Sequence, residues 1–393
     1  MTATSHPLVI VGAGLAGWTV AREFRKLDAT RSIVMVTSDS GDFYAKPTLS
    51  NAYAQKRTPE QLVTTPAQKM AETLQVELHA QTQVLGIDTQ AQKLTTQKGT
   101  EKQTLAYGHL VLANGAHPIR VPIEGDAADQ VLSVNHLADF AKFHAKLGSA
   151  PKNVLVLGAG LIGCEFANDL VQGGYTVHVV DPATTALAAM LPSQASAQLR
   201  DALQGLGVVW HFGTTLQSLM HREGRMQAHL ANGELLNADL VLSAIGLRAE
   251  TGLAQHSGLV CERGIVVSNT LQTSAKNVYA LGDCAQYASA QSRTLPYVMP
   301  IMNAARALAA TLHGTDSPVV FPVMPVSVKT PALPIVLVSP PPNVVGQWKP
   351  EPDLDGALGG AWRFVDDQGH ARGFVLTGKQ TSRRMELSKE VVL

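Results

Sequence analysis

Two copies of one strand-turn-helix pattern constrain the fold of this chain more than any other feature of its sequence. Residues 8–17 (LVIVGAGLAG) and 154–163 (VLVLGAGLIG) each run from a fully apolar segment into a GxGxxG turn. A helix-forming stretch follows each turn, and a second apolar segment follows each helix, at 33–36 and 176–180. This order predicts two α/β units, each with a parallel sheet.

The glycines of both turns occupy the positions that a bound pyrophosphate requires. The first glycine makes the turn, the second lets backbone N–H groups approach the phosphates, and the third lets the helix lie close to the sheet. The helix N-terminus then faces the phosphates. We expect cofactor contacts at Gly12, Ala13, Gly14, Leu15 and Gly17 in the first copy, and at Gly158, Gly160 and Gly163 in the second.

A carboxylate follows the second strand of each copy, where ribose hydroxyls are held in units of this kind. Asp39, with Ser38 beside it, follows the first, and Asp181 follows the second. A carboxylate repels a 2′-phosphate, and residues 182–186 contain no Arg or Lys to hold one. Asp181 therefore favours NADH over NADPH. The alternative is that both aspartates only cap turns.

Composition excludes several classes of partner. With 31 Lys and Arg against 31 Asp and Glu, the chain has no global basic field for nucleic acid. No segment approaches the roughly 20 apolar residues of a membrane-spanning helix, and residues 1–7 lack the basic region of a signal peptide, so we expect no membrane insertion and a cytoplasmic location. The three cysteines and the histidines form no ligand cluster, so no metal site is expected.

The helix expected after the second glycine turn has one unusual residue. Ile162, Phe166 and Leu170 recur every four residues and predict an apolar stripe toward the sheet, with Asn168 and Asp169, followed by Gln172, facing water. Glu165 lies in the first turn of this half-buried helix, where a carboxylate needs a partner. It either compensates the helix dipole or pairs with a lysine beside a cofactor.

Three further segments carry information. Residues 107–118 and 239–248 are strands that end in glycine turns, and we interpret them as crossing points between domains. Residues 277–284 (NVYALGDC) are a strand ending in Gly282-Asp283, and a helix is predicted over 301–312. An aspartate at the carboxyl end of a strand is able to hold a polyol chain through its hydroxyls.

The order GxGxxG, ANGAHP, a second GxGxxG with GCEFA, SAIG and YALGDCA resembles the FAD/NAD(P)H oxidoreductases of the pyridine nucleotide-disulfide reductase superfamily. Residues 39–50 (DSGDFYAKPTLS) and 325–331 (PVSVKTP) look like the bacterial rubredoxin reductases of alkane oxidation. The resemblance implies two Rossmann-like, three-layer ββα domains and a small C-terminal α+β domain. The implied boundaries are 1–115 with 246–319 for the FAD domain, 116–245 for the NAD domain and 320–393 for the C-terminal domain.

The same resemblance implies the cofactors FAD and NADH and adds contacts outside the glycine turns. It places Val84 against the FAD adenine. The further contacts that it implies for the flavin region are Lys46, Pro47, Gly282, Asp283, Val298 and Lys329.

Departures from the superfamily indicate how electrons leave the flavin. Disulfide reductases carry a cysteine pair after the second strand of the FAD unit, but residues 40–60 contain no cysteine. NADH gives two electrons at once and an iron centre takes one, so the flavin itself must join the two steps. We expect Lys46 and Lys329 to stabilise the negative charge of reduced flavin, and Glu165 to pair with Lys46.

The resemblance implies rubredoxin, a small acidic iron protein, as the electron acceptor. Two alternatives stay open: the reductase component of a [2Fe-2S] ferredoxin oxygenase system, and an NADH-binding flavoprotein redox sensor. The candidate docking cations, in or near the C-terminal domain, are Lys329, Lys379, Arg383 and Arg384. The alternative for Arg383 and Arg384 is that they only solubilise a terminal helix.

Overall fold

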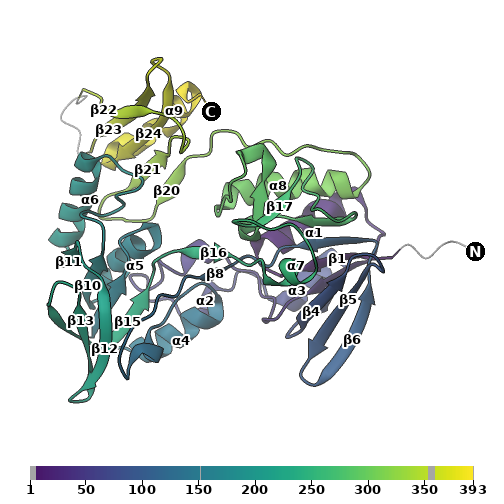
Figure 1. The fold of residues 1–393 in the computed structure, drawn as a ribbon, viewed down its shortest axis with the longest axis horizontal. Coiled ribbons are helices and arrows are strands. Elements are labelled where there is room, and N and C mark those ends of the chain that lie inside the picture. Colours follow the sequence, from purple (N-terminus) through teal and green to yellow (C-terminus); the bar gives the residue numbers. More distant parts are fainter. Residues whose placement is uncertain (1–5, 151, 353–358, 393) are drawn as a thin grey trace, which may run out of the picture. The chain divides into compact units, whose positions relative to one another are not determined.

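The structure is a computed structural model that describes residues 6–150, 152–352 and 359–392. The chain divides into two compact units, and Figure 1 labels many of their elements. The first unit comprises Met1–Ala45, Val63–His117 and Leu247–Pro322. The second unit comprises Lys46–Leu62, Pro118–Gly246 and Val323–Leu393.

A five-stranded parallel sheet forms the centre of the first unit, in the order β18-β7-β1-β2-β3. The central strands β1 and β2 are short, apolar and fully buried, as expected for a parallel sheet that is covered on both faces. Helices α1 and α8 contact each other, and the antiparallel strands β4, β5 and β6 share their hydrophobic core with the parallel sheet. The bounds are β1 Leu8–Val11, β2 Ile33–Val36, β3 Val76–His79, β4 Gln83–Asp88, β5 Lys93–Lys98, β6 Glu101–Ala106, β7 His109–Leu112, β18 Val278–Ala280, α1 Leu15–Leu27 and α8 Val298–Leu312.

Shorter elements complete this part of the chain. Strands β17 and β19 form a parallel pair, and β8 and β16 form another two-stranded sheet. The bounds are α3 Ala67–Leu74, α7 Gly252–His256, β8 Ala116–Pro118, β16 Leu247–Ala249, β17 Ile265–Val267 and β19 Ala285–Tyr287.

The second unit repeats the same layering around a four-stranded parallel sheet, in the order β11-β10-β9-β15. Strands β12, β13 and β14 form an antiparallel sheet that shares a core with it. The bounds are β9 Asn153–Leu157, β10 Thr176–Asp181, β11 Val209–Phe212, β12 Leu216–Arg222, β13 Arg225–Leu230, β14 Leu235–Ala238, β15 Leu240–Ser243, α2 Pro59–Leu62, α4 Leu137–Leu147, α5 Leu161–Gln172 and α6 Ser193–Gly205.

The end of the chain forms a five-stranded antiparallel sheet, in the order β20-β21-β24-β23-β22, with one helix packed on it. Phe374 and Leu376 on β24 and Leu387 on α9 are fully buried in one cluster. The bounds are β20 Val326–Val328, β21 Ile335–Val338, β22 Gly346–Pro350, β23 Ala361–Asp366, β24 Ala371–Thr377 and α9 Arg384–Glu390.

The predicted fold class is confirmed, because each glycine turn lies between a parallel strand and a helix and a small α+β sheet follows. The domain boundaries stay a prediction.

One helix is longer than expected. Helix α8 begins at Val298, whereas the sequence predicted a helix over 301–312. In the described part of the chain, none of the helices is both long and apolar enough to cross a membrane.

The prediction of which residues of α5 face the sheet and which face water is wrong at three positions. Ile162, expected against the sheet, is 43% exposed because it lies in the first turn, at the open end of the helix. Asn168 and Asp169, expected in water, are buried. Other segments of the second unit cover that face, and their backbone N–H groups donate to side-chain oxygens of both residues.

Candidate functional site

The first glycine turn has no room for side chains at the two positions where the pattern requires glycine. Gly12 has φ +104°, a conformation that favours glycine, and a Cβ there would collide with the carbonyl of Ala113. A Cβ on Gly17 would collide with the carbonyl oxygen of Gly12. The turn and the first helical turn of α1 are therefore locked together by close backbone contact.

The second position of the turn is open. A Cβ on Gly14 would have no atom within 4 Å, and none of the described side chains caps α1 at this residue. The first N–H groups of a helix have no partner within the helix, and together with the helix dipole they attract an anion. Gly14 therefore leaves a backbone cradle that fits the pyrophosphate of a dinucleotide.

The second glycine turn has the same construction. Gly158 has φ +101°, and a Cβ there would lie 2.7 Å from the carbonyl oxygen of Ala244. A Cβ on Gly163 would collide with the carbonyl of Gly158, whereas one on Gly160 would meet nothing within 4 Å. None of the described side chains caps α5 at Gly160. This turn also fits a dinucleotide phosphate.

Asp39 and Asp181, the carboxylates predicted to bind ribose, both accept hydrogen bonds from backbone N–H groups of nearby turns, as the alternative interpretation expected. Asp39 is exposed, and its Oδ1 accepts the N–H of Gly41 at 2.9 Å. Asp181 accepts the N–H of Ala183 at 2.7 Å and, with its other oxygen, the N–H of Ala159 at 2.6 Å. Because Ala159 belongs to the glycine turn, Asp181 holds that turn against the end of β10.

The Gly282-Asp283 segment lies beside the start of α1 in the first unit. A Cβ on Gly282 would be 3.1 Å from the Cβ of Ala16, and the N–H of Gly282 donates to the Tyr287 hydroxyl at 2.7 Å. Asp283 is partly exposed at this edge of the sheet. Burial raises the pKa of the neighbouring Cys284 thiol to about 12, which makes it an inert group.

The other predicted first-unit contacts have less distinctive surroundings. Val84 lies on β4, partly buried against the core. Val298 is the first residue of α8 and is 39% exposed. Ser38 is exposed beside Asp39.

A buried ion pair lies in the second unit. Glu165 on α5 is 4% exposed, and its Oε2 is paired with the Nζ of Lys329. The same oxygen accepts the hydroxyl of Ser50 at 2.6 Å, and the ammonium group of Lys329 donates to that hydroxyl at 3.1 Å. The backbone N–H of Lys329 donates to Oε1 of Glu165 at 3.0 Å. Both oxygens of this carboxylate are therefore satisfied.

The partner of Lys46 differs from the one predicted, whereas its role beside the flavin stays a prediction. We expected it to pair with Glu165, but the carboxylate has its ion pair with Lys329, which reaches it from the C-terminal part of the chain. The ammonium group of Lys46 donates to Oδ1 of the buried Asn135 at 3.3 Å. Lys46 and Pro47 form a short 3-10 turn with Thr48.

The predicted site residues are divided between the units. The structure brings Glu165 and Lys329 together, and Ser50, which the sequence reasoning missed, joins them. It also missed Asn168 and Asp169, whose side chains bind backbone N–H groups. Their spacing from Glu165, three and four residues, places all three on one side of a helix, and a polar stripe on a half-buried helix is the signal that identifies them.

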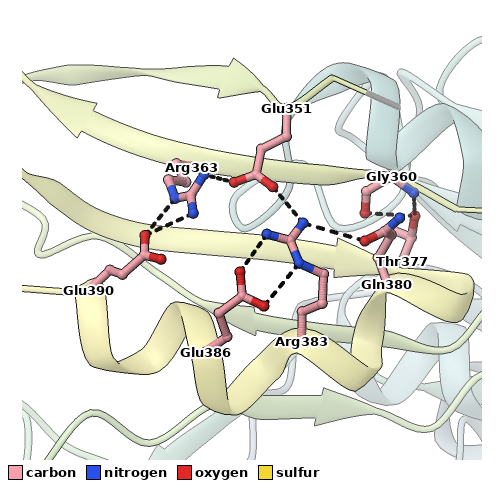
Figure 2. Close-up of polar contacts among 8 residues, drawn as sticks. All are labelled: Glu351, Gly360, Arg363, Thr377, Gln380, Arg383, Glu386 and Glu390. Carbon is pink, nitrogen blue, oxygen red and sulfur yellow. Dashed lines mark hydrogen bonds and ion pairs between the residues drawn. The ribbon is translucent and has the colours of Figure 1, made fainter. Parts of the chain in front are cut away.

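Two of the predicted docking cations form ion pairs with carboxylates of this chain, as Figure 2 shows for Arg383. Its guanidinium group pairs with Glu351 at 2.6 Å and with Glu386 at 2.8 Å. Glu351 also pairs with Arg363, which holds Glu390 at 2.8 Å. This network ties α9 to the sheet. Lys329, the second cation, is paired with Glu165.

The other two docking candidates, Lys379 and Arg384, are exposed. The segment that contains Lys379 matches most of a phosphate-binding P-loop but forms the end of β24 and a 3-10 turn. Among the residues that the structure describes, no group of three His, Cys, Asp or Glu side chains is placed to hold a metal ion.

Comparisons with known families assign two regions of the chain. Residues 6–309 match the family described as pyridine nucleotide-disulphide oxidoreductase. Residues 318–391 match the rubredoxin binding C-terminal domain.

Individual relatives match over nearly the whole chain. It is 43% identical to a rubredoxin-NAD(+) reductase of Alcanivorax borkumensis, over 98% of each chain. It is 37% identical to a nitric oxide reductase FlRd-NAD(+) reductase of Aliivibrio fischeri, over 98% of this chain and 99% of that one. Among solved structures, the putidaredoxin reductase in a covalent complex with putidaredoxin aligns with a TM-score of 0.87 and 23% identity, covering 99% of this chain and 94% of that one.

The ion-pair network predicts that Arg383 stabilises the folded protein. Replacing it with alanine (Arg383→Ala) leaves Glu351, a largely buried carboxylate, with one cationic partner fewer. We expect the free energy of unfolding to fall by about 1 to 3 kcal/mol, measured by urea unfolding. Arg384→Ala, on the exposed side of the same segment, should change it by less than about 0.5 kcal/mol. An Arg383→Ala protein of wild-type stability would contradict the prediction.

Proposed function

The chain belongs to the pyridine nucleotide-disulphide oxidoreductase family, and from this premise we propose that it is an NADH-dependent flavoprotein that reduces rubredoxin. One NADH gives two electrons, so each turnover reduces two ferric rubredoxins and releases one proton. The match of residues 318–391 to a rubredoxin binding domain supports the choice of acceptor. The relative from Alcanivorax borkumensis, named a rubredoxin-NAD(+) reductase, supports the whole activity.

The observation that carries this proposal is the contact of Glu165 with Lys329. Helix α5 starts at the second glycine turn, where NADH is expected, and Lys329 follows the first strand of the rubredoxin-binding region. The buried ion pair joins the helix proposed to bind nicotinamide to the region that matches a rubredoxin binding domain, inside one compact unit. Residues 40–60 contain no cysteine to serve as an intermediate carrier.

Each cofactor has a place that suits its phosphates. The turn from Gly12 to Gly17 would hold the pyrophosphate of FAD, with Asp39 toward the ribose and Asp283 toward the polyol chain. The turn from Gly158 to Gly163 would hold NADH. When bound, the flavin supplies the exchange between two-electron and one-electron chemistry.

The protein's own lysines supply charge at the site. An ammonium group that faces reduced flavin stabilises its negative charge. We assign this role to Lys46 and Lys329. The roles of Asn135 and of Glu165 with Ser50 are to hold these two ammonium groups in place.

The physiological pathway is a further part of the proposal. We place the protein in the cytoplasm, where its three unpaired cysteines stay reduced, and assign its rubredoxin to an alkane hydroxylase. The resemblance of residues 39–50 and 325–331 to the reductases of alkane oxidation supports this assignment. In a reconstituted mixture of reductase, rubredoxin and hydroxylase, NADH consumption should depend on added alkane. Consumption that does not respond to alkane would refute the assignment.

A comparison of acceptors tests the proposed activity. With saturating NADH, stopped-flow spectroscopy should show rubredoxin reduced at least about tenfold faster than a [2Fe-2S] ferredoxin. The rubredoxin rate should fall as salt rises above about 0.1 M, because steering between charges is screened over roughly 10 Å at that concentration. Lys379→Ala and Arg384→Ala should weaken this salt dependence, with Lys98→Ala, exposed on β5 of the first unit, as the control.

Three results would argue for another function. A ferredoxin rate that exceeds the rubredoxin rate would favour the oxygenase component. Flavin that is reduced by NADH but passes electrons to neither acceptor would favour a redox sensor. A rubredoxin rate that is independent of salt would remove the electrostatic docking surface.

The charge of the lysines predicts the flavin midpoint potential. We expect Lys46→Ala and Lys329→Ala to lower it by about 30 mV or more, which for a two-electron couple is about 1.4 kcal/mol. A Glu165→Gln/Lys329→Ala double variant separates the loss of the cation from the effect of an unpaired buried carboxylate. Spectroelectrochemical titration measures each potential, and Lys349→Ala is the control. Unchanged potentials would refute the tuning role.

A further inference from the structure

Helix α5 carries three buried polar side chains within little more than one turn. Glu165, Asn168 and Asp169 are 4%, 1% and 2% exposed. Glu165 has its ion pair with Lys329. The other two side chains point away from water and have no part in the activity described so far.

Asp169 binds three consecutive backbone N–H groups of one segment. Its Oδ2 accepts from Ala52 at 2.7 Å and from Tyr53 at 2.8 Å, and its Oδ1 accepts from Ala54 at 2.9 Å. Burial raises the pKa of the Asp169 carboxyl, and the three N–H donors act against that shift. The ionised carboxylate has two oxygens that only accept, so this form accepts all three N–H donors.

The segment held by Asp169 carries residues of the site. Residues 46–54 include Lys46 and also Ser50, whose hydroxyl contacts both Glu165 and Lys329. Ser50 lies only two residues before the first N–H that Asp169 accepts. The position of the Ser50 hydroxyl therefore depends on how the backbone at 52–54 is fixed to α5.

Asn168 binds the other segment of the site in the same way. Its Oδ1 accepts the N–H of Ala332 at 3.1 Å, three residues after Lys329. One helix thus holds the chain on both sides of the ion pair, through Asp169 at the Ser50 segment and through Asn168 at the Lys329 segment.

We propose that Asp169 is a positioning residue for the reaction: by fixing residues 52–54 to α5, it holds the Ser50 hydroxyl against the Glu165–Lys329 pair. The inference rests on the proposed function and deepens it. Asp169 acts through the Ser50 segment and is not itself a reacting group. An asparagine has one oxygen and an NH₂ group, so it cannot accept from all three donors.

The test compares Asp169→Asn with the wild type as flavin-loaded full chains. Hydrogen exchange should show faster exchange of the amides of residues 52–54 in the variant. Flavin reduction at saturating NADH should slow by about tenfold to a hundredfold, because small displacements of positioned groups have effects of this size. The NADH concentration at half-saturation should stay within about twofold. A loss of stability alone would lower the melting temperature without slowing flavin reduction at saturating NADH while the half-saturating concentration stays the same.

A double-variant cycle tests the route through Ser50. If Asp169 acts by placing that hydroxyl, Ser50→Ala alone should slow flavin reduction, and Ser50→Ala/Asp169→Asn should be little slower than Asp169→Asn. Asp201→Asn, which removes a carboxylate on α6 that is 63% exposed, is the matched control and should leave exchange and rate unchanged.

Several outcomes would overturn the inference. A folded Asp169→Asn protein with the wild-type rate of flavin reduction would do so. So would a Ser50→Ala/Asp169→Asn variant whose rate of flavin reduction falls by the product of the two single effects. If Asp169→Asn does not fold, a wild-type rate in Ser50→Ala is sufficient to refute it. These measurements use NADH and flavin only, so a failure of rubredoxin reduction would refute the proposed function and leave this test intact.

Discussion

The buried carboxylate of Glu165 is the constraint on which the arrangement of the second unit depends. Removing a charged group from water costs several kcal/mol unless a cation and hydrogen bonds replace the water. Here Lys329 supplies the cation and a backbone N–H, and Ser50 supplies a hydroxyl. Three stretches of chain must therefore meet: the helix after the second glycine turn, the 46–54 segment and the start of the C-terminal region. The same requirement places the C-terminal region, which matches a rubredoxin binding domain, against the helix that follows the second glycine turn.

The two glycine turns solve a different problem with backbone atoms alone. At Gly12 and Gly158 the positive φ and the nearby carbonyls exclude any side chain, while Gly14 and Gly160 leave open space at uncapped helix ends. Such an end attracts phosphate without a basic residue. This explains how a chain with balanced charge is able to bind two anionic cofactors. Under the proposed function, its cationic groups are then available for the flavin and for the acceptor.

Charge near the C-terminus has two separate uses. Arg383 and Arg363 are held between Glu351, Glu386 and Glu390, where they join α9 to the sheet. Lys379 and Arg384 are exposed and suit an acidic partner. Neighbouring residues Arg383 and Arg384 therefore differ in role although the sequence presents them as one basic pair. Burial against a carboxylate separates the structural cation from the candidate docking cation.

The sequence by itself determined the two α/β units, the positions of their strands and glycine turns, and the need of Glu165 for a partner. These features follow from short-range rules of apolar periodicity and turn chemistry. Tertiary structure alone decided that the partner is Lys329 and that Ser50 joins it. It also decided that Asp169, expected in water, is buried against Ala52, Tyr53 and Ala54. The physical reason is that the burial of a polar group depends on which distant segment covers it, and residues 115 or more positions apart leave no local pattern of their contact.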